Sequence, residues 1–152
     1  MTNRLGWLFA AVLVFTATAA TAANEVKITA DTFVVNEAAA EAVFTGNVVV
    51  VRPGLTVWAD RIVIDYAEGG LENIRSLVAT GHVRLKTEDQ DATGERATFN
   101  PQTQILRLTG SVTVVNASGT LSGPELEIDL ARNTTTFSGG KAGRVTGVFT
   151  TQ

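Results

Sequence analysis

The side chains that could carry out chemistry are few in this sequence. His82 is the only histidine and there is no cysteine, so a transition-metal site would have too few ligands. His82 could serve as a general base, but it follows a glycine on the polar side of a predicted strand, and we interpret it as a solvated surface residue. Asp60 and Asp65 are five residues apart, which predicts that they point to opposite faces of an extended strand. That arrangement is poor for the paired carboxylates of a glycosidase.

An acidic run at residues 88–91 is the other candidate site. It could bind Ca²⁺ weakly, but it lacks the spacing of an EF-hand loop, and we interpret it as a solvated turn. The sequence contains no G-x-S-x-G, P-loop or dinucleotide-binding motif. We therefore predict that the chain is not an enzyme and uses no metal or cofactor.

The first 22 residues are typical of a cleaved signal peptide. Arg4 precedes an apolar run at residues 5–15, which is too short to span a bilayer, and Ala20-Thr21-Ala22 fits a cleavage site. A retained membrane anchor is the alternative. Cleavage leaves 11 of the 12 basic residues against 15 acidic ones, a formal charge of −4, which gives no basic surface for nucleic acid. Without cysteines, packing alone must hold the exported domain together.

A repeat runs through the rest of the chain. Three Thr-Gly-x-Val segments, beginning at residues 45, 80 and 109, alternate with small residues in steps of 13 and 16. A six-residue insertion around residues 68–73 interrupts the pattern. Glycine within a strand pattern commonly marks a bulge or bend. We place bends at Gly46, Gly81, Gly94, Gly110 and Gly123.

Between the bends, apolar and polar residues alternate with period 2, as in antiparallel strands with one apolar face. Because every strand has such a face, the sheet must fold over on itself. We predict an all-β fold, a bent antiparallel β-jellyroll over residues 23–139, with a right-handed parallel β-helix as the alternative. The residues predicted to line its interior are Ile28, Phe33, Val35, Phe44, Val48, Val50, Ile62, Ile64, Val83, Leu85, Phe99, Leu108, Val112, Val114, Leu126 and Ile128.

The alternation alone favours a closed core over a ligand-binding trough. After Gly139 the pattern breaks, because Lys141 and Gly143 occupy positions that are apolar in the other repeats. We expect residues 140–152 to form a flexible tail or a weak last strand.

The repeat resembles the OstA-like domain of the LptA family of periplasmic lipopolysaccharide transport proteins, over roughly residues 26–139. The segments that carry the resemblance are Phe44-Thr45-Gly46-Asn47-Val48, Ala79-Thr80-Gly81-His82-Val83, and residues 59–66 and 123–130. The resemblance implies a V-shaped, open-ended jellyroll located in the periplasm. It also implies that the apolar interior passes lipopolysaccharide, held by its lipid A acyl chains, between the inner and outer membranes during outer-membrane assembly.

The same resemblance implies three protein partners: an LptC-like inner-membrane protein, an LptD-like outer-membrane translocon, and further copies of the chain joined head to tail. Unpaired strand edges at the open ends would make such contacts possible. Two alternative functions remain. The chain could be an LptC-like partner anchored in the inner membrane, or a secreted structural or adhesive β-repeat module.

Overall fold

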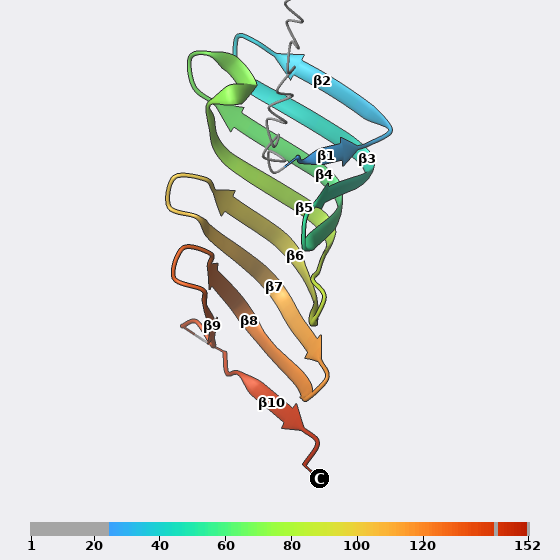
Figure 1. Ribbon diagram of the computed structural model, residues 1–152, viewed down its shortest axis with the longest axis vertical. Coiled ribbons are helices and arrows are strands. Elements are labelled where there is room, and N and C mark those ends of the chain that lie inside the picture. The colour runs from blue at the N-terminus through green and yellow to red at the C-terminus, as the bar shows by residue number, and fades with distance from the viewer. Residues whose placement is uncertain (1–24, 142, 152) are drawn as a thin grey trace, which may run out of the picture.

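The part of the chain that the structure describes is built mainly from β-strands (Figure 1). The computed structural model describes residues 25–141 and 143–151, so the predicted signal peptide lies outside the described residues. None of the helical structure within those ranges is long and apolar enough to cross a membrane. The elements are β1 (Lys27–Thr29), β2 (Thr32–Asn36), β3 (Glu41–Arg52), β4 (Leu55–Tyr66), the 3-10 helix η1 (Gly70–Glu72), β5 (Ile74–Lys86), β6 (Gln90–Asn100), β7 (Ile105–Asn116), β8 (Gly119–Asp129), β9 (Thr134–Ser138) and β10 (Thr146–Phe149).

The strands form one antiparallel sheet in the order β1-β3-β4-β5-β6-β7-β8-β10. At one end β1 and β2 both pair with β3, and at the other end β9 and β10 both pair with β8. The six long strands from β3 to β8 therefore cross between two half-sheets. We name these the β2–β9 half-sheet and the β1–β10 half-sheet, after the strands at their edges. Every pairing is antiparallel and the sheet does not close, which confirms the bent, open-ended jellyroll and excludes the parallel β-helix.

A line of β-bulges separates the two half-sheets. The register shifts at this level in every pairing from β3–β4 to β7–β8. Gly46, Gly81 and Gly110 adopt φ values of +83°, +78° and +83° there, a conformation that glycine reaches without a steric penalty. The bends predicted at these three glycines are confirmed.

The bends at Gly94 and Gly123 need glycine for a different reason. A Cβ atom at Gly94 would lie 2.7 Å from the Leu108 side chain, and one at Gly123 would lie 2.7 Å from the Phe137 ring. The missing side chain at each position therefore lets a large apolar residue of the next strand pack closely over the bend.

The inner face, formed by alternate residues of the long strands, makes a single apolar core that includes both half-sheets. The largest of its fully buried side chains are Leu108, Leu126, Val48, Val83 and Val112. No polar side chain of the described chain is buried. Burying each large apolar side chain is worth about 1.5–3 kcal/mol, so this face supplies the main force holding the two half-sheets together.

Candidate functional site

The residues predicted to line the interior all lie on the inner face, with different degrees of burial. Four are partly buried against the core: Ile28, Phe44, Phe99 and Ile128. Ten are buried in its centre: Val48, Val50, Ile62, Ile64, Val83, Leu85, Leu108, Val112, Val114 and Leu126. Phe33 and Val35 are exposed, at 49% and 44%, because they lie on the edge strand β2. Whether lipid contacts these side chains remains a prediction.

Sequence reasoning missed part of this face. The alternation of β5, β7 and β8 also marks Leu77, Leu106 and Leu121, and all three belong to the core or pack against it. Tyr66 is buried too, at the end of β4. Several further core positions are filled by alanine, a residue that gives little signal in a hydrophobic pattern: Ala42, Ala59, Ala79, Ala92 and Ala97.

The apolar face reaches an exposed aromatic residue at each end of the sheet. At the β2 end, the Phe33 ring stacks on Phe44 with 4.4 Å between the ring centroids. At the other end, Phe149 of β10 pairs with Gly119 and is 58% exposed. The face is therefore closed in its centre and open at both ends. Residues 140–152, for which a tail or a weak strand was expected, contain the strand that extends it.

Carboxylates cover the bends on the outside of the sheet. Asp31 accepts a hydrogen bond of 3.0 Å from the side chain of Asn47, and Nδ1 of His82 lies 2.8 Å from Oδ2 of Asp60. The hydrogen bond to Asp60 raises the pKa of His82. The His82 side chain is 92% exposed, in agreement with a solvated surface histidine.

The prediction that Asp60 and Asp65 lie on opposite faces is wrong. The bulge in β4 falls between Trp58 and Arg61, so the buried positions change from Ala59 to Ile62, three residues on. The shift in parity places Asp60 and Asp65 on the same outer side. Asp60 pairs with His82, so the two carboxylates form no shared site.

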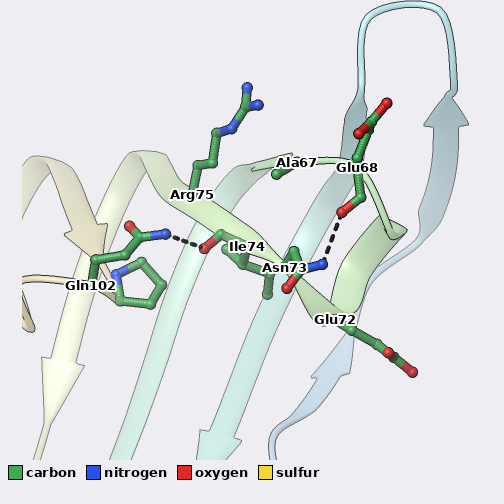
Figure 2. Close-up of a pocket in the computed structure, with 8 residues that line it drawn as sticks. Ala67, Glu68, Glu72, Asn73, Ile74, Arg75 and Gln102 are labelled. Carbon is green, nitrogen blue, oxygen red and sulfur yellow. Dashed lines mark hydrogen bonds between the residues drawn. The ribbon is translucent and has the colours of Figure 1, made fainter.

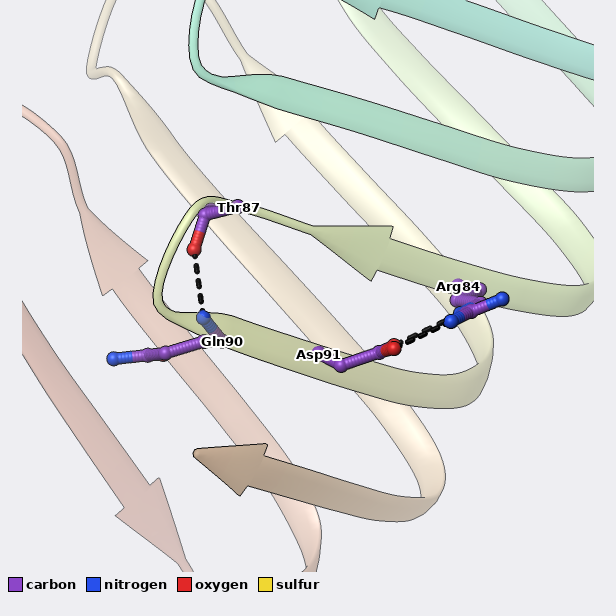
Figure 3. A network of polar contacts seen from close by, with 4 residues as sticks. All are labelled: Arg84, Thr87, Gln90 and Asp91. Atoms are coloured by element: carbon purple, nitrogen blue, oxygen red, sulfur yellow. Dashed lines mark hydrogen bonds and ion pairs between the residues drawn. The ribbon is translucent and has the colours of Figure 1, made fainter. Parts of the chain in front are cut away.

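The acidic run at residues 88–91 begins in the turn between β5 and β6 and ends in β6, where the Asp91 carboxylate is paired with Arg84 (Figure 3). Nε of Arg84 donates a hydrogen bond of 2.9 Å to Asp91, and this contact lowers the pKa of Asp91. The guanidinium also lies 5.1 Å from the ring centroid of Trp58. Thr87 and Gln90 close the turn through their hydrogen bonds. No group of three or more potential metal ligands occurs in the part of the chain that the structure describes.

A surface pocket lies beside the insertion between β4 and β5 (Figure 2). The Asn73 side chain donates a hydrogen bond of 2.8 Å to the Glu68 carbonyl, and Gln102 donates one of 3.3 Å to the Ile74 carbonyl. The first bond closes the insertion on itself, and the second ties the start of β5 to the turn after β6. The pocket combines acidic, basic and amide side chains, so it differs in kind from the apolar inner face.

Comparison with known proteins found a match to a family model and a match to a solved structure. Residues 27–134 match the model of a family described as LptA/(LptD N-terminal domain) LPS transport protein. The fold is similar to that of LptH from Pseudomonas aeruginosa, described as the LptA-homologous periplasmic component of its lipopolysaccharide transport device, with a TM-score of 0.68 at 16% sequence identity. The similarity covers 84% of this chain and 96% of LptH. No sequence among curated proteins matches the chain significantly.

Proposed function

Because the chain belongs to the LptA/(LptD N-terminal domain) family of lipopolysaccharide transport proteins, we propose that it carries lipopolysaccharide across the periplasm by holding the acyl chains against its inner face. The lipid-lining residues would be the sixteen inner-face positions predicted from the sequence. In this proposal the signal peptide is cleaved on export, and the mature protein bridges the inner and outer membranes.

The observation that carries the proposal is the chemistry of the inner face. It is apolar from Phe33 to Phe149, and no described polar side chain is buried within it. Transfer of an acyl chain of a dozen carbons out of water gains about 10 kcal/mol, at about 0.8 kcal/mol per CH₂ group. A face without buried polar groups offers this gain at every point along its length, so a lipid could move without crossing a desolvated charge.

Entry of lipid requires the inner face to open. Side chains such as Leu108 and Val83 are 1% exposed, so an acyl chain must displace them or part the two half-sheets. The line of bulges is the natural hinge for such a movement, because the β-ladders are already interrupted there. The exposed ends at Phe33 and Phe149 are the points at which lipid would enter and leave.

The two open ends support contacts with protein partners. All five residues of β2 and all four of β10 are exposed, and each strand borders an edge of the sheet. Strand addition there would join the chain to an LptC-like protein, an LptD-like translocon or another copy of itself. An LptC-like anchored role remains the alternative, and retention of residues 1–22 on the exported protein would favour it.

Binding of a fluorescent lipid A analogue to the purified mature chain tests the proposal. We expect saturable binding that unlabelled lipopolysaccharide displaces. The test variant, Ile64→Asp, places a charge on the inner face. Its matched control, Val63→Asp, places the same charge on the outer face of the same strand. Equal binding by both folded variants, or no binding by wild type, would contradict the proposal.

A further inference from the structure

Among the described strands, one charged residue is aligned with the apolar inner face, and it lies at the border of that face. Val48 and Val50 of β3 are buried on the inner face, and Arg52 is two residues further along the same strand. Side chains two residues apart on a strand point to the same side of the sheet. Arg52 is only partly buried, and no other charged residue occupies a paired inner-face position in the strands that the structure describes.

The neighbours of Arg52 connect it to the apolar core. Its partner on β4 is Leu55, which packs against the core, and the next inner-face pair is Val50 and Val57. The hydrocarbon stem of an arginine can cover such side chains while its guanidinium stays in water. Arg52 therefore places a positive charge where the apolar face meets solvent.

The charge of Arg52 is available to a ligand. None of the ion pairs within residues 25–141 and 143–151 includes Arg52. A second cation, Lys27, pairs in register with Val51, the residue before Arg52, and Glu25 is the acidic residue nearest to Lys27 in the described sequence. The turn that follows Arg52 is open, because a Cβ atom at Gly54 would meet no atom within 4 Å. A bulky anionic group could thus approach the guanidinium.

The opposite border of the inner face has a different character. There the paired inner-face positions of β4 and β5 end in Tyr66 and Ile74, which are uncharged. The cations near this border have acidic neighbours, since Arg75 lines a pocket together with two glutamates and Nε of Arg132 lies 3.9 Å from Asp129. The two borders therefore differ in the charge that they offer to a ligand on the inner face.

We propose that Arg52 binds a phosphate of the lipid headgroup while the acyl chains lie against the inner face beside it. This inference rests on the proposed function. A lipid on the inner face must leave its charged headgroup in water at a border of that face, because burying an unpaired charge is costly. A guanidinium binds phosphate through two parallel hydrogen bonds. Arg52 holds the headgroup at the border of the β1–β10 half-sheet, so bound lipids share one orientation.

The contact with phosphate is weaker than the contact with the acyl chains. Arg52 is partly exposed, so water and salt screen its charge. We expect the phosphate contact to contribute a factor of about five to ten in affinity, whereas the acyl chains supply most of the binding. A contact of this strength orients the lipid and still allows its release.

Two lipids that differ only in phosphate test the role of Arg52. Lipid A and its dephosphorylated form, with the same acyl chains, are each used to displace a fluorescent lipid A analogue from the mature chain. The test variant, Arg52→Gln, removes the charge, and Arg52→Lys restores a charge without the planar fork. The matched control, Arg61→Gln, removes an exposed arginine from the outer face of β4. Circular dichroism checks that each variant is folded.

We expect wild type to bind lipid A about five- to tenfold more tightly than the dephosphorylated form at low salt, and the ratio to shrink as salt is added. Arg52→Gln should lose most of this preference, Arg52→Lys should keep part of it, and Arg61→Gln should keep all of it. An equal preference in wild type and Arg52→Gln, or an equal loss in Arg61→Gln, would overturn the proposal.

Millimolar inorganic phosphate at constant ionic strength separates a headgroup site from a general phosphate site. We expect it to leave the preference of wild type unchanged, because free phosphate gains nothing from the apolar face. Loss of the preference in phosphate overturns the assignment to a lipid headgroup. Failure of wild type to bind either lipid contradicts the proposed function as well, whereas saturable binding that Arg52→Gln leaves unchanged overturns the Arg52 site alone.

Discussion

Replacing Gly81 by alanine isolates the contact that builds the bend. Gly81 has φ +78° and lies beneath the Asp60 side chain, where an added Cβ would be 2.3 Å from Oδ2 and 2.8 Å from Cβ of Asp60. Gly70 has nearly the same backbone, φ +82°, but no atom lies within 4 Å of its Cβ position. Both substitutions carry the left-handed penalty of about 1–2 kcal/mol, and only Gly81→Ala adds a collision.

We expect Gly81→Ala to lower the free energy of unfolding by about 1–3 kcal/mol more than Gly70→Ala does, the usual cost of overpacking. Unfolding in urea, followed by circular dichroism and compared at equal m-values, measures both. In an Asp60→Gly background, which removes the contacting atoms, the penalty at residue 81 should fall to that at residue 70. Equal penalties at the two glycines in the wild-type background would refute this account of the bend.

Three further predictions concern the core, the bend and the edge. Leu108→Ala should destabilise the chain by about 2–5 kcal/mol in the same urea assay, because the side chain is 1% exposed, and a loss under 1 kcal/mol would argue against a closed centre. Asp60 raises the pKa of His82, so protonated His82 stabilises the fold below its unfolded pKa of 6.5, and this contribution disappears as pH rises through the folded pKa. An NMR titration should give a His82 pKa above 6.5 that returns toward 6.5 in Asp60→Asn, and an unchanged value in the variant would contradict the pairing. Phe33→Pro should interrupt pairing on β2 and keep the folded protein monomeric across a concentration series in which wild type grows larger, whereas equal growth would exclude that edge as a docking site.

The sequence predicted the inner face well because alternation is a local property. Val48 and Val50, or Ile62 and Ile64, are two residues apart on one strand, and period 2 places each pair on one face wherever the strand lies. The bends at Gly46, Gly81 and Gly110 were predictable for a related reason, since glycine in a strand pattern marks a bulge.

The features that the sequence did not predict correctly depend on contacts between strands of the sheet. Asp60 and Asp65 share a side because a bulge between them changes the parity, which counting residues along one strand ignores. The strand ending at Phe149 was not predicted firmly because Lys141 and Gly143 break the apolar pattern before it, and its place is set by pairing with β8. The ion pairs of Arg107 also depend on strand pairing, because its partners Glu125 and Glu127, at 3.0 Å and 2.6 Å, lie on a neighbouring strand.

The insertion shows a further limit of the pattern. Its position and turn-like character follow from Gly69 and Gly70, which have φ values of +99° and +82°. The hydrogen bond from Gln102 to Ile74, the residue that follows the insertion, is evident only from the tertiary structure. The chemistry of the pocket between them was therefore not predictable from the repeat.

Site-specific photo-crosslinking to lipopolysaccharide tests the central claim most directly. A photoreactive residue is placed at Ile64 or Phe99 on the inner face, and at Arg61 or Asp129 on the outer face of the same half-sheet. If acyl chains contact the inner face, the first two sites should capture lipopolysaccharide and the last two should capture little. Equal yields at all four sites, or capture at the outer sites alone, would contradict transport along the inner face.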